Sequence, residues 1–361
     1  MRVSLLRIRA LRRLQEVELV PGPGLNLLVG DNGAGKTSVL EALHLMAYGR
    51  SFRGRVRDGL VRTGTPALEV YVEWHQADGG RERRAGLRHG GASWEGRLDG
   101  QPVAQLGDLC AALAVVTFEP GSHALVGGSG EPRRRFMDWG LFHVEPGFLP
   151  LWRRYARALR QRNVLLKNAA PAGELDVWDL ELAAAGEPLA GYRQAYLEGL
   201  EPALMETVAR VAPSLGSASL HFQPGWRRGE MPLADALLLA RERDRALGHT
   251  TIGPHRADWR VGFGSMPEAE ALSRGQAKLA ALSCLLAQAR NLAGRLGEWP
   301  VVALDDLASE LDAGHRGRVL EALAESGAQV FVTGTDAPDM PAGQGGKARL
   351  FHVEQGRVAP A

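Results

Sequence analysis

The sequence contains little cysteine and no long apolar segment. Its two cysteines, Cys110 and Cys284, lie far apart and belong to no metal-ligand spacing, so we expect neither a disulfide framework nor a zinc site. No apolar run approaches the roughly 18 residues that a membrane span requires. The N-terminal segment carries arginines from Arg2 to Arg13 and does not have the form of a signal peptide. These absences predict a cytoplasmic protein without a membrane partner.

The chain also lacks a large excess of charge of either sign. Its formal net charge is +2, so any binding of nucleic acid must depend on local basic patches. Most cations are arginine, in a chain rich in alanine and glycine, which is typical of a GC-rich coding sequence. Arginine content by itself is therefore weak evidence for phosphate recognition. The length of 361 residues allows two or three domains, and no internal repeat is present.

What the sequence does contain is a phosphate-binding loop. Gly30, Gly35, Lys36 and Thr37 have the spacing G-x-x-x-x-G-K-S/T between an apolar strand segment and the start of a helix. Backbone N–H groups of such a loop surround the β-phosphate, the lysine adds positive charge, and the threonine hydroxyl binds Mg²⁺. The alternative is a glycine-rich turn that contains a lysine by chance. Such a turn would not require an apolar strand before it and a helix start after it, and both are present here. The predicted ATP-binding residues of the loop are Gly30, Asp31, Asn32, Gly33, Ala34, Gly35, Lys36, Thr37 and Ser38.

Two acidic residues follow a second apolar strand segment, at 301–304. Asp305 and Asp306 stand where a parallel α/β sheet presents ligands, at the carboxyl end of the strand. We expect Asp305 to hold Mg²⁺ directly or through water, and Asp306 to orient or deprotonate the attacking water. The alternative is an ordinary acidic boundary between a strand and a loop. The phosphate-binding loop earlier in the chain favours the interpretation that the two segments form one nucleotide site.

The pattern of strands and helices predicts an α/β fold with an inserted, mainly helical domain. We place an N-terminal part of the head at residues 1–130, a helical insert at 131–249 and a C-terminal part of the head at 250–361. Within the insert the pattern predicts separate helices at 174–185 and 192–211. The strand expected at 257–263 marks the return of sheet-like sequence. No heptad pattern indicates a long coiled coil.

The segment Ser273–Gln276 opens a long predicted helix and resembles the L-S-G-G-Q signature of the ABC ATPase class, with Arg274 in place of the first glycine. A helix cap is the simpler interpretation of Ser273. The order of loop, signature and acidic strand is that of the class. The resemblance implies an ABC-type head with a mixed sheet, in which Ser273, Gly275 and Gln276 of one subunit reach the ATP that Lys36 of a second subunit holds. It thereby adds Ser273 to Lys36, Asp305 and Asp306 as predicted catalytic residues.

Other segments resemble one branch of this class, the bacterial RecF family. They are Gly49–Arg53, Arg133–Asp138 after Phe118–Pro120, Thr251–Asp258, Ser273–Gln276 and Leu304–Asp306. The resemblance implies an ATP-dependent homodimer that binds single-stranded, gapped and duplex DNA and acts with RecR and RecO to load RecA. It also implies roles in repair, recombination, replication and the SOS response.

Three positions depart from the wider class. Thr333–Asp336 stands where a histidine switch is expected, Glu119 lies in the region of the Q-loop, and Asp306 replaces the more frequent glutamate. The shorter carboxylate predicts slow hydrolysis, which suits a switch better than a motor. Together with the resemblance, it implies a weak, DNA-stimulated ATPase.

Two basic segments are candidates for contacts with DNA phosphates. The first is the run Arg133, Arg134 and Arg135, and the second is the helix face from Arg153 through Arg157 to Arg162. A solvated arginine-rich face is the alternative interpretation. Two other functions also remain open: the nucleotide-binding subunit of a transporter, and a scaffold that binds ATP without turnover.

Overall fold

The computed structural model describes residues 1–54, 59–76, 80–90, 93–265, 272–336 and 348–361. These residues form two compact units. The first unit contains Met1–His123, Thr207–Pro213 and Leu272–Ala361, and the second contains Ala124–Glu206 and Ser214–Ala271. The second unit is larger than the insert expected at 131–249, because it takes in residues on both sides of that range.

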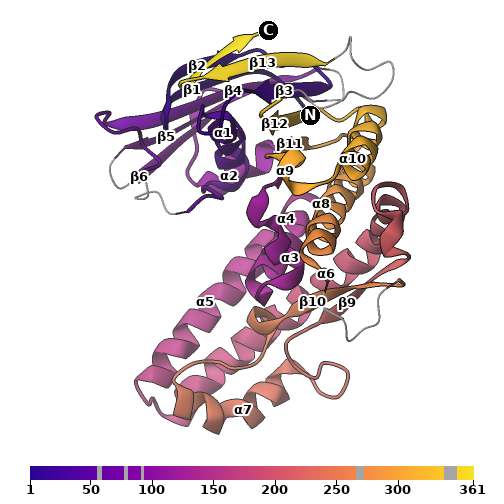
Figure 1. Ribbon diagram of the computed structural model, residues 1–361. Coiled ribbons are helices and arrows are strands. Elements are labelled where there is room, and N and C mark those ends of the chain that lie inside the picture. Colours follow the sequence, from indigo (N-terminus) through magenta and orange to yellow (C-terminus); the bar gives the residue numbers. More distant parts are fainter. Residues whose placement is uncertain (55–58, 77–79, 91–92, 266–271, 337–347) are drawn as a thin grey trace. The chain divides into compact units, whose positions relative to one another are not determined.

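The first unit contains a mainly parallel sheet with the strand order β14-β13-β3-β12-β11-β8 (Figure 1). Four of its strands, β3, β8, β11 and β12, are buried along their whole length, as expected for parallel strands covered on both faces. β14 pairs antiparallel with β13 at the edge. The bounds are β3 (Leu25–Val29), β8 (Val115–Phe118), β11 (Val301–Leu304), β12 (Val330–Gly334), β13 (Arg349–Glu354) and β14 (Arg357–Pro360).

A second, antiparallel sheet of the first unit has the order β2-β1-β4-β5-β6-β7. In β4, buried Leu68, Val70, Val72 and Trp74 alternate with more exposed neighbours, which confirms the antiparallel strand expected from the sequence alternation. The bounds are β1 (Arg2–Leu11), β2 (Leu14–Leu19), β4 (Ala67–His75), β5 (Glu82–Gly90), β6 (Ser93–Leu98) and β7 (Gln101–Pro102).

Helices of the first unit pack against the parallel sheet. α1 contacts β8 and β12, and α8 contacts β8. α8 begins with a capping box, in which Ser273 and Gln276 bond reciprocally, and ends at Gly297 in the left-handed conformation. The bounds are α1 (Lys36–Tyr48), α2 (Leu106–Ala112), η1 (Pro120–His123), α8 (Arg274–Leu296), α9 (Leu307–Glu310) and α10 (Ala313–Ser326).

The second unit is built mainly from helices. α5 and α6 run alongside each other (Figure 1), joined by the buried ion pair between Arg162 and Asp179 (2.5 Å). None of the helices described in the chain is both long and apolar enough to cross a bilayer. The bounds are α3 (Ala124–Gly127), α4 (Gly130–Val144), α5 (Phe148–Lys167), α6 (Ala172–Val211), η2 (Pro213–Leu215), β9 (Ala218–Gln223), α7 (Leu233–Leu247), η3 (Pro254–Arg256) and β10 (Asp258–Phe263).

The prediction of two helices at 174–185 and 192–211 is wrong, because α6 continues through Pro188 and Pro202. An internal proline costs a helix about 3 kcal/mol. The buried leucines Leu182, Leu189, Leu197 and Leu204 are spaced by seven or eight residues, so they lie on one face of a single helix. Burial of that face outweighs the local preference of the prolines to end a helix.

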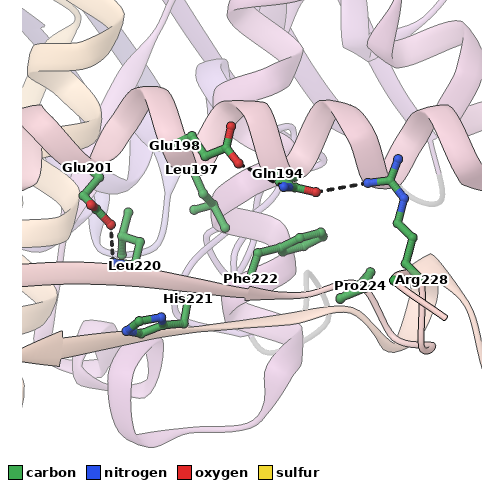
Figure 2. Close-up of a pocket in the computed structure, with 10 residues that line it drawn as sticks. Gln194, Leu197, Glu198, Glu201, Leu220, His221, Phe222, Pro224 and Arg228 are labelled. Atoms are coloured by element: carbon green, nitrogen blue, oxygen red, sulfur yellow. Dashed lines mark hydrogen bonds between the residues drawn. The ribbon is translucent and has the colours of Figure 1, made fainter.

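The strand expected at 257–263 is present as β10, but it pairs with β9 in the second unit. Figure 2 shows how this hairpin is attached to α6. The carboxylate of Glu201 accepts a hydrogen bond from the Leu220 N–H (2.6 Å), and Arg228 donates to Gln194 (3.1 Å). A hollow of about 650 Å³ lies between the helix and β9. The sequence of β10 indicates a strand but does not name its pairing partner.

Candidate nucleotide-binding site

The loop between β3 and α1 has a backbone that only glycine adopts readily. Gly30, Gly33 and Gly35 have φ values of 152°, 79° and 120°. A Cβ on Gly30 would lie 2.1 Å from the Val353 carbonyl oxygen. Lys36 Nζ donates to the carbonyl oxygens of Gly30 (2.5 Å) and Asp31 (2.9 Å). The ammonium group is therefore held at the centre of a loop whose shape suits an anion.

The acidic strand meets this loop through one buried carboxylate. Asp305 Oδ1 accepts hydrogen bonds from the hydroxyls of Thr37 (2.9 Å) and Thr333 (2.7 Å). Thr333 Oγ1 in turn accepts a bond from the Asp306 N–H (2.8 Å). Burial raises the pKa of Asp305 above its usual range; the two hydroxyl bonds oppose this rise, and the charge of Asp306 adds to it. The start of α1, the end of β11 and the strand β12 thus place Thr37, Asp305 and Thr333 in one cluster.

Asp306 follows Asp305 in a constrained position. Its φ is 50°, in the left-handed region, and its carboxylate accepts a bond from Ser309 Oγ (2.5 Å). A non-glycine residue in this conformation requires support from its surroundings, here the bond from its N–H to Thr333 and the contact with Ser309. The turn directs the side chain of Asp306 into the hollow that Lys36 and Thr37 also line.

Most of the predicted loop and strand residues meet at this hollow of about 660 Å³. The carbonyl groups of Gly30 and Asp31 accept from Lys36, and that of Ala34 accepts from the Gly356 N–H (2.9 Å). The predicted residues that line the hollow are Asn32, Gly33, Gly35, Lys36, Thr37, Ser38, Asp305 and Asp306.

The signature residues lie elsewhere on the first unit. Ser273 and Gly275 are exposed, and neither they nor Gln276 belong to the described lining of the hollow. Ser273 and Gln276 bond to each other in the capping box of α8. A Cβ added to Gly275 would meet nothing within 4 Å. Within one chain, therefore, the signature does not reach the nucleotide-binding hollow.

Several residues that line the hollow were not among the site residues predicted from the sequence. Arg12, Arg13 and Arg53 line the hollow. Arg13 donates to the Gly33 carbonyl oxygen (3.0 Å), and Arg12 pairs with the buried Glu41 (2.9 Å). The arginines of the N-terminal segment and the RecF-like segment Gly49–Arg53 are apparent in the sequence. Only the fold shows that Arg12, Arg13 and Arg53 lie beside the phosphate loop.

Glu119 and Thr333 also line the hollow. Burial raises the pKa of Glu119; the Gly121 N–H bond (2.6 Å) opposes the rise, and the charge of Asp305 adds to it. Thr333 is the first residue of the segment Thr333–Asp336, where the wider class predicts a histidine switch. Its hydroxyl connects Asp305 with the backbone of Asp306, so it positions both acidic residues.

The first basic segment, Arg133 to Arg135, forms hydrogen bonds and ion pairs with other residues of the second unit. Arg133, whose side chain is 11% exposed, forms two bonds to the Asp258 carboxylate (2.6 and 2.8 Å). Arg134 donates to the Ala257 carbonyl oxygen (2.9 Å). Arg135 is exposed and pairs with Glu131. The segments Arg133–Asp138 and Thr251–Asp258 therefore pack against each other, and Arg133 stabilises that contact.

The second basic segment divides into buried and exposed parts. Arg162 is fully buried between Asp179 (2.5 Å) and Asp244 (2.7 Å), so it cannot contact DNA. This corrects the expectation that the helix face extends to Arg162. Arg153 and Arg157 are exposed and line a groove between α5 and α6.

The chain matches known families over nearly its whole length. The family model described as "RecF/RecN/SMC N terminal domain" matches residues 2–358. The DNA replication and repair protein RecF of Stenotrophomonas maltophilia is 64% identical over 99% of both chains. RecF of Thioalkalivibrio sulfidiphilus is 39% identical over 98% of both.

Solved structures agree on the fold. A RecF described as the recombination mediator of the RecFOR pathway with ATP has a TM-score of 0.88 at 24% identity, covering 100% of this chain and 97% of its own. An Smc head has a TM-score of 0.58 at 15% identity, with 100% and 97% covered. The fold and the site geometry thus define an ATPase head of the SMC-like, ABC type. The chain belongs to the RecF family.

Replacement of Thr333 tests the acidic cluster. Thr333→Val keeps the side-chain shape but removes the hydroxyl that bonds Asp305 and Asp306. Because second-layer contacts of this kind affect activity by about 10- to 100-fold, we expect ATP hydrolysis to fall by that factor while ATP binding is retained. Phosphate release under single-turnover conditions measures the change, with Thr335→Val on the exposed side of the turn as the control. An unchanged hydrolysis rate would contradict the positioning role of Thr333.

Replacement of Arg133 and Arg135 separates a structural arginine from a surface one. Arg133→Ala leaves the Asp258 carboxylate without its guanidinium partner, so we expect the free energy of unfolding to fall by about 1–3 kcal/mol. Arg135→Ala removes an exposed pair and is expected to change it by about 0.5 kcal/mol or less. Urea unfolding followed by circular dichroism measures both. Equal effects of the two substitutions would show that Arg133 does not stabilise the second unit.

Proposed function

We propose that this chain is an ATP-dependent DNA-binding switch of recombinational repair and replication restart. One observation carries the proposal: Thr37 of the phosphate loop, Asp305 of the acidic strand and Thr333 form a single hydrogen-bonded cluster beside Lys36. This arrangement is the one that binding and hydrolysis of a nucleoside triphosphate require. The family supplies the biological setting, because its curated relatives are named DNA replication and repair proteins.

The donor atoms at the site fit Mg²⁺. The Thr37 hydroxyl and the Asp305 carboxylate are hard oxygen donors within 2.9 Å of each other, and Mg²⁺ is commonly held by one or two such protein groups together with phosphate oxygens. When bound, Mg²⁺ neutralises charge on the phosphates. Lys36, which now bonds two carbonyl oxygens of its own loop, can turn to phosphate oxygens, which bind an ammonium group more strongly.

Asp306 is the proposed residue that orients the attacking water and accepts its proton. Its side chain lines the hollow and is held by Ser309 (2.5 Å). Aspartate reaches less far than glutamate, and the bond from Ser309 to Oδ2 restricts how far the carboxylate can turn toward a water. Both features support slow hydrolysis, which suits a switch. The same bond also favours the alternative of an ATP-binding scaffold without turnover, which single-turnover hydrolysis with gapped DNA would distinguish.

A second copy of the chain would complete the site. Ser273 and Gly275 are exposed and do not line the hollow of their own chain. Gly275 has open space where a side chain would stand, so a phosphate could approach the N-terminus of α8 closely. We therefore propose an ATP-dependent homodimer in which Ser273, Gly275 and Gln276 of each chain contact the nucleotide held by the other.

The proposed partners of the dimer are single-stranded, gapped and duplex DNA, together with RecR and RecO. The solved RecF described as part of the RecFOR pathway supports RecR and RecO as partners, and the relatives named DNA replication and repair proteins support DNA. Among the arginines of the first basic segment, Arg135 is the proposed phosphate contact, because Arg133 and Arg134 are engaged within the second unit. Membership of the RecF family favours this function over that of a transporter subunit.

Loss of Lys36 from the phosphate loop should prevent ATP-induced dimerisation. Lys36→Ala removes the charge that binds the β- and γ-phosphates, so we expect ATP no longer to induce dimers or to strengthen binding to gapped DNA. Light scattering and gel-shift measurements with and without ATP test this, with Lys167→Ala as the matched control. ATP-induced dimers of the Lys36 variant would contradict the shared site.

Mixing two inactive variants provides a sharper test of the shared site. Lys36→Ala and Ser273→Arg should each abolish hydrolysis alone. In a heterodimer both defects fall on one site and leave the other site intact, so an equal mixture should recover about a quarter of the wild-type rate. Phosphate release from the mixture measures this. If Ser273 acted within its own chain, each heterodimer would have two defective sites and no activity would return.

A further inference from the structure

The groove between α5 and α6 has a volume of about 750 Å³ and lies entirely within the second unit. One wall belongs to α5 and the other to α6, so both walls are helical. Arg154 on α5 spans to Glu181 on α6 through two bonds of 2.6 and 2.7 Å. The groove is therefore a formed feature of the unit.

The α6 wall of this groove is apolar and largely exposed. The side chains of Val177 and Leu180 are 64% and 66% exposed, although both are large and apolar. With Ala184 they follow the spacing i, i+3, i+7, which places them in one stripe along the helix. Trp178 from α6 and Ala158 from α5 complete the apolar lining. Single exposed apolar residues are ordinary, but a continuous stripe that lines a groove indicates an interaction site.

The rim of the groove carries positive charge. Arg153, Arg154 and Arg157 from α5 line it, together with one carboxylate, that of Glu181. These three arginines outnumber the one carboxylate of the described lining, so the rim beside the apolar stripe carries net positive charge. A ligand that complements this surface has an apolar side and a negatively charged side.

We propose that this α5–α6 groove docks an acidic amphipathic helix of a partner protein. Apolar side chains of that helix would cover Val177, Leu180 and Ala184, and its carboxylates would face Arg153 and Arg157. A helix presents apolar residues at i, i+3 or i+4 and i+7, the same spacing as the stripe it would cover. The apolar contact supplies the affinity, and the charged rim sets the orientation of the helix.

The apolar stripe distinguishes this partner from DNA. Contacts to DNA go mainly to phosphates and sugars, from basic and polar side chains, and Arg153 and Arg157 alone would suit them. DNA bound at these arginines would leave Val177 and Leu180 uncovered. A protein helix satisfies both the charge and the apolar surface, so it accounts for more of the groove.

The test uses the full chain and a designed probe. The probe is a fluorescein-labelled helical peptide of about 15 residues, with leucines at i, i+3 and i+7 and glutamates flanking them. Fluorescence anisotropy measures its binding. We expect Leu180→Glu and Arg157→Glu each to weaken binding by about tenfold or more, as for residues at the centre of an interface. Both side chains are exposed, so the fold should tolerate the changes.

Two control variants show whether a change of charge or of exposed apolar area outside the groove also affects binding of the probe. Leu239→Glu alters a leucine of α7 that is 73% exposed, and Arg160→Glu alters an exposed arginine of α5; neither residue lines the groove. Both should bind the probe as the unchanged chain does, and all four variants should retain ATP binding. A peptide with lysines in place of the glutamates should bind poorly.

Three results would overturn the proposal. In the first, a scrambled peptide of the same composition binds as well as the probe. In the second, Leu180→Glu and Arg157→Glu spare peptide binding but weaken binding to duplex DNA, which would make the groove a DNA surface. In the third, the same two changes spare peptide binding but abolish ATP-induced dimers, which would make it a contact between copies of the chain.

Discussion

The buried carboxylate of Asp305 is the contact on which the nucleotide site depends. It accepts hydroxyl bonds from Thr37 and Thr333, so the phosphate loop, the acidic strand and the neighbouring strand β12 are joined at one atom. A buried carboxylate is costly unless hydrogen bonds satisfy it, which is why two threonines stand beside it. The same bonds fix the Thr37 hydroxyl and, through Thr333, the backbone of Asp306. Thr333 and Asp306, which differ from the residues of the wider ABC class, are thus held in place by hydrogen bonds to the same cluster.

The second unit depends on buried ion pairs of arginine. Arg162 lies between Asp179 and Asp244, Arg193 bonds Asp138 through two bonds of 2.9 Å, and Arg133 bonds Asp258. Loss of one partner of such a pair leaves a buried charge unmatched, so these arginines hold helices and the β9–β10 hairpin in place. In an arginine-rich chain, burial is what distinguishes a structural guanidinium from one that is available to a ligand.

Two kinds of incompleteness suggest how the protein works with others. The nucleotide hollow lacks the signature residues of its own chain, which face solvent at the start of α8. The α5–α6 groove exposes an apolar stripe beside positive charge. In the proposed function, the first feature accounts for control by ATP, because the signature residues of a second copy complete the site. The second is the surface of the second unit at which we propose that a helix of a partner protein docks.

The sequence by itself determined the phosphate loop, the acidic strand end and the α/β class, because each is a local pattern in which neighbouring residues carry the chemistry. The sequence also predicted β4 from the alternation of apolar and polar residues at 67–75. It could not determine that Thr333 bridges Asp305 and Asp306, that Arg12 and Arg53 reach the loop, or that Arg133 and Arg162 are engaged internally. Nor could it show that α6 passes through Pro188, or that β10 pairs with β9. Each of these depends on which distant residues the fold brings together, and burial there outweighs local preference.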